Sequence, residues 1–182
     1  QGFYQQIAEY SAHHQIPLIA DIISNFHPVE SVIRHPDVFL GENTPESLQP
    51  DLLVTFGLSV ISKNLKLFLR KRRPKAHWHI QPSGVAADTF QALTQVIHTR
   101  PATFFQIAQD WAGKSLGDYY QAWRTQEEQA VQKITKFFEY SKAQTSEFYA
   151  VATVLLNLPQ PSNLHLANSM AVRYANLIGL PS

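Results

Sequence analysis

The stretch Asp51-Leu52-Leu53-Val54-Thr55-Phe56-Gly57 decides the fold of this chain. Its apolar residues follow one another almost without interruption, as in a strand that is covered on both faces. Gly57 then turns the chain into a segment in which Ile61, Leu65 and Phe68 recur at helical spacing. A buried strand that leads into an amphipathic helix is typical of an α/β fold with a parallel sheet.

Segments on either side repeat this alternation. Apolar spacing over residues 3–14 predicts a helix, and the short apolar run of residues 16–20 predicts a buried strand. We expect two more strands over residues 76–81 and 94–98, the last at the edge of the sheet, and a helix that begins at Pro101. The first part of the chain therefore reads as an α/β domain.

The remainder of the chain is predicted to be largely helical. Aromatic and aliphatic residues from Tyr119 to Phe137 recur at helical spacing, with Glu127 and Glu128 on the expected polar side. We interpret this stripe as core or inter-domain packing and not as a cofactor site. Another amphipathic helix ends before Pro159. These helices are expected to lead out of the first domain into the beginning of a second.

Bulk composition excludes several classes of function. The 182 residues carry a net charge of +1, which gives no general argument for binding nucleic acid. Without cysteine there is no disulfide or thiolate chemistry, and no apolar run is long enough to span a bilayer. The basic run at residues 70–75 is interpreted as a solvated helix end, with phosphate contact as the alternative.

The most distinctive candidate site is Asn168-Ser169-Met170-Ala171-Val172-Arg173, which follows an apolar segment, residues 164–167, expected to be a strand. Ligands of open α/β sheets bind where strands end. Ser169 offers a hydroxyl and Arg173 a planar cationic fork suited to a carboxylate or phosphate. The alternative is an ordinary helix start, capped by Asn168 or Ser169, with Arg173 in solvent.

Two further sets of residues are candidate sites. Lys63 lies in the first turn of the helix after Gly57, where a cation opposes the helix dipole, so it is either a solvated lysine or a group that faces an anion. His77 and His79 would share one strand face, but nothing at ligand spacing completes a metal site, so we expect an exposed or edge pair. Gly57 alone does not make a nucleotide-binding fingerprint.

Six segments, in order along the chain, together resemble one family. They are Ile16-Pro17-Leu18-Ile19-Ala20-Asp21, Pro50-Asp51-Leu52-Leu53-Val54 with Phe56-Gly57, Ser62-Lys63, Pro82-Ser83-Gly84, Thr94-Gln95-Val96-Ile97 and Asn168-Ser169-Met170-Ala171-Val172-Arg173. The family is 2-succinyl-5-enolpyruvyl-6-hydroxy-3-cyclohexene-1-carboxylate synthase of menaquinone biosynthesis, a thiamine-diphosphate enzyme. The last segment is the most specific.

The resemblance implies a fold and a domain organisation. It implies a Rossmann-like parallel sheet with helices on both faces in a middle domain over residues 1–112, and a linker helix region over residues 113–143. Residues 144–182 would begin a truncated C-terminal diphosphate-binding domain. The chain would thus be a fragment, inactive alone, of a cytoplasmic homodimer or homotetramer without an integral membrane segment.

The resemblance also implies an activity for the full-length parent. That enzyme would use thiamine diphosphate with Mg²⁺ or Mn²⁺ to decarboxylate 2-oxoglutarate and add the succinyl carbanion to isochorismate, as a transferase of the carboligase type. Lys63, Ser169 and Arg173 match substrate-binding positions. No catalytic, cofactor-binding or metal-binding residue is carried over to this chain. Asn64 and Ala167 depart from the usual pattern.

Two other functions remain open at the level of sequence. One is a nucleotide- or flavin-binding α/β module with a scaffolding or regulatory role. The other is a nucleic-acid binder that uses the basic run at residues 70–75. Flavin absorbance would identify the first, and salt-sensitive retention on DNA or RNA would identify the second.

Overall fold

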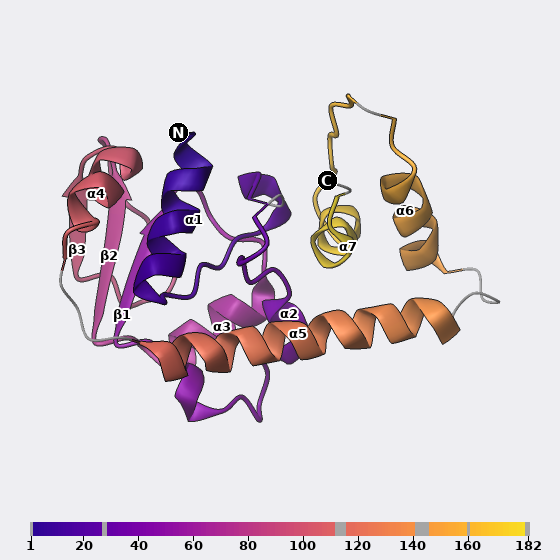
Figure 1. Ribbon diagram of the computed structural model, residues 1–182, viewed down its shortest axis with the longest axis horizontal. Helices are drawn as coiled ribbons and strands as arrows, with labels where there is room; N and C mark the ends of the chain where they lie inside the picture. Colours follow the sequence, from indigo (N-terminus) through magenta and orange to yellow (C-terminus); the bar gives the residue numbers. More distant parts are fainter. Residues whose placement is uncertain (1, 27–28, 112–115, 141–145, 160, 181–182) are drawn as a thin grey trace.

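A computed structural model describes residues 2–26, 29–111, 116–140, 146–159 and 161–180 (Figure 1). Its sheet has three parallel strands in the order β1-β2-β3. They are β1 (Leu52–Phe56), β2 (Ala76–Gln81) and β3 (Gln95–His98). Three of the expected strands, and the edge position of the last, are confirmed.

Helices cover both faces of this sheet (Figure 1). On one face, α1 (Phe3–His14) and α4 (Pro101–Ala108) pack around the buried Ile80. On the other, α3 (Lys63–Lys71) and the first half of α5 (Gly117–Tyr140) share a core. Successive side chains of β1 point to opposite faces of the sheet: Val54 packs on the side of α1 and α4, and Leu53 on the side of α3 and α5. The predicted α/β class with a helix-covered parallel sheet is therefore confirmed.

The long helix α5 joins this α/β part to two C-terminal helices, α6 (Glu147–Leu156) and α7 (Met170–Ile178) (Figure 1). Near its start, the buried Trp123 ring lies 5.7 Å from the Phe39 ring. Near its end, Phe138 stacks on Phe148 of α6 with ring centroids 5.0 Å apart. Three short helices complete the described elements: η1 (Ile22–Ser24), α2 (Pro36–Phe39) and η2 (Glu46–Leu48).

The expected strand over residues 16–20 is wrong. Only an isolated parallel bridge forms, between Ile19 and Ile33, although its two backbone hydrogen bonds are intact at 2.8 and 3.2 Å. In a parallel ladder the next donor would be the His35 amide. That amide donates instead to the Glu127 carboxylate at 3.1 Å, so a side chain from α5 ends the ladder after one rung.

The expected strand over residues 164–167 is also wrong. Leu164 and Leu166 are half-buried against a third apolar cluster, formed by Ile22, Leu155, Val172 and Ala175, while His165 and Ala167 are exposed. The alternation that suggested a strand is therefore real. No described strand lies beside the segment to pair with it, and a strand without a partner has no ladder.

Candidate functional site

The start of α3 is held by several hydrogen bonds. Ser62, with 0% of its surface exposed, accepts a hydrogen bond from the Leu65 amide at 3.1 Å and donates to Asp37 Oδ1 at 2.8 Å. The same Asp37 oxygen accepts the Asn64 amide at 2.7 Å. The Ser62 hydroxyl caps this helix, and the Asp37 charge, brought by α2, complements the helix dipole that Lys63 opposes.

Lys63 itself is the first residue of α3, as predicted, and its side chain is exposed. Among the described residues, no carboxylate pairs with its ammonium group. The residues that neighbour Lys63 thus stabilise the start of α3, and Lys63 itself does not. The ammonium group is available to an anion from outside this part of the chain.

The start of α7 is built differently. Ser169 occupies the N-cap position with φ 80° and ψ −131°, a backbone conformation that favours glycine, and its hydroxyl makes no capping hydrogen bond. Asn168 Oδ1 accepts only the Ser169 amide, at 2.8 Å. The prediction that Asn168 or Ser169 caps this helix is therefore wrong. The exposed Ser169 hydroxyl is left to another partner.

Arg173 lies one turn along α7 from Ser169 and is half-buried. Its guanidinium forms no hydrogen bond or ion pair with any residue that the structure describes. The interpretation of Arg173 as a fully solvated side chain is therefore only partly right. Five donors in a fixed fork on a half-buried stem suit a planar carboxylate.

The two helix starts meet at a shared apolar cluster. Ile61, just before α3, and Val172, next to Arg173, both pack in the cluster that contains Ile22. Asp21, 6% exposed, accepts the Ile61 amide. Burial raises the pKa of Asp21, although the amides of Ile61 and Ser62 oppose this shift. The structure therefore brings the segments of Lys63 and Arg173 to one region, but no described hydrogen bond joins the two side chains.

Two buried residues beside this region were not predicted. His35 Nδ1 lies 2.6 Å from Glu127 Oε1, and His35 Nε2 lies 3.1 Å from the Leu177 carbonyl of α7. Burial alone would raise the pKa of Glu127, but the side-chain bond, charge and amide of His35, with the Arg34 amide, together lower it. Glu127 is not on the solvated side of α5 as expected, because its carboxylate pairs with a buried basic partner 92 residues earlier in the chain.

The histidines of β2 also differ from expectation. They lie on the central strand, not at an edge, and His77 is 2% exposed. Thr55 Oγ1 lies 2.8 Å from both His77 Nε2 and His79 Nδ1. Burial lowers the pKa of His77, despite the opposing charge of Asp88. Across the described ranges, no three His, Cys, Asp or Glu side chains come together as a metal site.

The basic run at residues 70–75 meets surface carboxylates. Arg72 pairs with Glu46 at 3.1 Å and Lys75 with Asp51 at 2.9 Å. Lys75 and Asp51 are both largely exposed, so their pair adds little to stability. This arrangement agrees with the interpretation of a solvated helix end.

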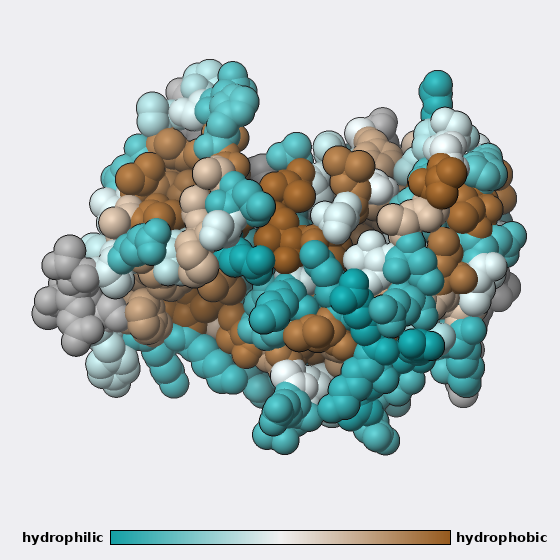
Figure 2. Space-filling view, turned by 180° about the vertical axis from the view of Figure 1, so that it is seen from behind, coloured by the Kyte–Doolittle hydropathy of each residue, from teal (hydrophilic) through white to brown (hydrophobic). Residues whose placement is uncertain are grey.

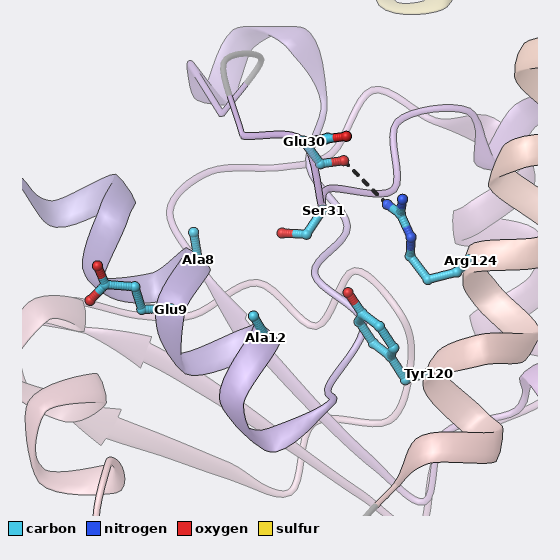
Figure 3. A pocket seen from close by; sticks show the side chains of 7 residues that line it. All are labelled: Ala8, Glu9, Ala12, Glu30, Ser31, Tyr120 and Arg124. Atoms are coloured by element: carbon cyan, nitrogen blue, oxygen red, sulfur yellow. Dashed lines mark hydrogen bonds between the residues drawn. The ribbon is translucent and has the colours of Figure 1, made fainter.

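A hollow in the described part of the molecule lies elsewhere, between α1 and α5 (Figure 3). It encloses about 370 Å³ and is open to solvent. It is lined by Ala8, Glu9, Ala12, Glu30, Ser31, Tyr120 and Arg124. Arg124 donates to the Glu30 carbonyl at 3.2 Å, across its rim. None of the three sequence-predicted residues lines this hollow.

Comparison with known proteins identifies the family of this chain. A family model described as the middle domain of thiamine pyrophosphate enzymes matches residues 2–166. The chain belongs to this family. The middle-domain match covers the sheet, α5 and α6, so the observed α/β architecture is that of a family member.

Curated relatives of this middle-domain chain carry one name, 2-succinyl-5-enolpyruvyl-6-hydroxy-3-cyclohexene-1-carboxylate synthase. The protein from Cytophaga hutchinsonii is 36% identical over 90% of this chain and 30% of its own length. That from Bacteroides fragilis is 35% identical over 82% and 26%, and that from Porphyromonas gingivalis 33% over 97% and 33%. The resemblance drawn from the sequence is confirmed. The chain spans about a third of the length of these relatives or less.

None of the helices in the described ranges has the length and apolar character needed to cross a membrane.

Proposed function

We propose that this chain is part of a longer thiamine-diphosphate-dependent synthase of menaquinone biosynthesis, cytoplasmic and at least dimeric. The full-length enzyme decarboxylates 2-oxoglutarate and joins the resulting four-carbon unit to isochorismate. The names of the relatives support this reaction. Both substrates carry two carboxylates, so their site needs cations and donors in fixed positions.

Lys63, Ser169 and Arg173 supply such groups in this proposal. The observation that carries it is Arg173, a half-buried residue whose guanidinium has no anionic partner among the described residues. A cation held partly away from water is stabilised by an incoming carboxylate. The uncapped Ser169 hydroxyl, on the same helix, and the exposed Lys63 ammonium add a donor and a second positive charge.

The cofactor is assigned to other parts of the longer protein. Thiamine diphosphate supplies carbanion stabilisation when bound. Its diphosphate would be held through Mg²⁺ or Mn²⁺ in the full-length protein, and the described residues bring no set of metal ligands together. We expect the isolated chain to be inactive, and turnover by this chain alone would contradict that expectation.

The domain boundaries remain part of the proposal: residues 1–112 as middle domain, 113–143 as linker and 144–182 as the beginning of another domain. Support comes from α6, where Val154 and Leu156 are 61% and 60% exposed. Apolar surface is visible over this C-terminal part of the molecule in Figure 2. A helix with apolar residues on its outer side is typically buried by further structure.

The test is an assay of the full-length protein with thiamine diphosphate, Mg²⁺, 2-oxoglutarate and isochorismate. Arg173→Ala is expected to raise the KM of one substrate about 10- to 100-fold, since a charged hydrogen bond contributes about 1.5–3 kcal/mol. Cofactor affinity should stay unchanged. Arg70→Ala, an exposed arginine on α3, is the matched control.

Three outcomes contradict this proposal. The first is that isochorismate is not consumed although the folded protein binds thiamine diphosphate. The second is that Arg173→Ala has the same KM values as the Arg70→Ala control. The third is that Arg173→Ala loses the cofactor. A yellow protein with flavin absorbance and no thiamine diphosphate would favour the nucleotide- or flavin-binding alternative.

A further inference from the structure

The Asp21–Ile22 dipeptide touches both helices that carry the proposed substrate-binding cations. On one side, Asp21 Oδ2 accepts the amide of Ile61, two residues before Lys63. On the other side, the Ile22 amide donates to Asn176 Oδ1 at 2.7 Å. Asn176 lies three residues after Arg173 in α7, less than one helical turn away. Two successive residues thus hold the start of α3 and the middle of α7.

Three of the four residues in this connection are buried, and Ile61 is partly buried. Asp21, Ile22 and Asn176 are 6%, 8% and 5% exposed. Hydrogen bonds in such surroundings are stronger than in water, and a group that loses its partner there is costly. The connection therefore resists displacement of α7 relative to α3.

The connection is too tight to be a ligand site. The space beside it, lined in part by Asp21, Ile22 and Asn176, is about 10 Å³. This is room for one water molecule at most. These polar groups serve the protein's own backbone amides, so they set positions and do not contact a substrate.

We propose that Asn176 is a positioning residue, which acts together with the Asp21–Ile22 dipeptide to fix the distance between Lys63 and Arg173. The inference rests on the proposed function, in which those two cations hold substrate carboxylates. A substrate with carboxylates at a fixed separation is bound well only if both cations are held at the matching distance. Asn176 exerts its effect through Arg173 and makes no contact with substrate.

The test uses the full-length protein and the two variants Asn176→Leu and Asn176→Asp. Leucine has a similar volume but removes the acceptor for the Ile22 amide and the donor to the Arg34 carbonyl, whereas aspartate removes only that donor and keeps an oxygen as the acceptor for Ile22. Asn176→Leu is expected to raise the KM of the substrate affected by Arg173→Ala about tenfold, with kcat within about twofold. Asn176→Asp should stay near the wild-type KM.

A double mutant separates positioning from simple loss of stability. If Asn176 acts through Arg173, Asn176→Leu raises KM in the wild type but has no further effect in the Arg173→Ala background. A purely structural role predicts the same factor in both backgrounds. An unchanged KM in Asn176→Leu, or an equal factor in both backgrounds, overturns this inference and leaves the proposed function intact.

Failure of the proposed function is recognised separately. If neither Arg173→Ala nor Lys63→Ala changes the KM of any substrate, the proposed function is wrong and this inference is overturned with it. Thermal unfolding of each variant shows whether Asn176→Leu folds. If it does not fold, Asn176→Ser and Asn176→Asp are compared in the same double-mutant scheme. If both of these variants have the KM of the wild type, the inference is overturned.

Discussion

The starts of α3 and α7 both place a serine at the N-cap and carry a proposed substrate-binding cation, yet they are built in opposite ways. Ser62 is buried, accepts a helix amide and donates to Asp37. Ser169 is exposed, has a positive φ and caps nothing. The difference teaches that α3 is held at its start, whereas α7 is held near its C-terminal end, by the hydrogen bond of Asn176 and by the contact of His35 with the Leu177 carbonyl. At the start of α7, the Ser169 hydroxyl makes no capping hydrogen bond.

The largest expected effect removes the charge that pairs with His35, the residue whose ring contacts α7 at Leu177. Glu127→Gln removes the charge of a buried pair and should lower the free energy of unfolding by about 3 kcal/mol at neutral pH. Because the folded-state pKa of Glu127 is lowered, its stabilisation is present above its ordinary value of 4.5 and lost as pH falls through the folded pKa.

Urea denaturation of wild type and Glu127→Gln at several pH values measures this effect. The difference between them should shrink as the pH falls below about 4.5. Glu128→Gln, on the exposed side of the same helix, is the control. A difference that does not change with pH would contradict the assigned role of the carboxylate.

The next effect tests the start of α3. Ser62→Ala should lower the free energy of unfolding by about 2 kcal/mol, because it removes a cap and one of the two donors to Asp37 Oδ1. Ser169→Ala is the matched control at α7 and should change stability by less than about 0.5 kcal/mol. If urea denaturation showed that Ser62→Ala and Ser169→Ala lower the free energy of unfolding equally, the contrast between the two helix starts would be wrong.

A smaller effect tests the backbone of α7. Ser169→Gly should raise the free energy of unfolding by about 1 kcal/mol, since relief of strain at positive φ outweighs the extra freedom of the unfolded chain. In the full-length enzyme the same change should raise a substrate KM, because the hydroxyl is lost. Thermal unfolding and KM together measure the trade-off, and a less stable Ser169→Gly variant would show that this backbone is not strained.

The smallest effect concerns Lys63. Lys63→Ala should raise the free energy of unfolding by about 0.5 kcal/mol at low salt, because a cation at a helix start opposes the dipole. The gain should fade in 1 M salt, where screening is strong. Lys71→Ala, at the favourable end of the same helix, should show the reverse sign. A loss of stability in Lys63→Ala would mean that its ammonium has a structural partner.

Much of the fold follows from local patterns. Strands β1, β2 and β3 and the helix start at Ser62 were predictable, because apolar runs and capping residues act over a few neighbours. Residues 16–20 and 164–167 carry the same apolar pattern but lack a ladder. A strand needs a partner, and the pattern of one segment does not show whether a partner is present.

The sequence alone determined the α/β class, the family and the three candidate residues Lys63, Ser169 and Arg173, since these depend on residue types and their order. Only the tertiary structure decided that Glu127 is buried beside His35, and that Ile22 donates to Asn176, 154 residues away. Such contacts carry no local signature, because a single buried polar residue is stable only where a distant segment supplies its hydrogen-bond partner.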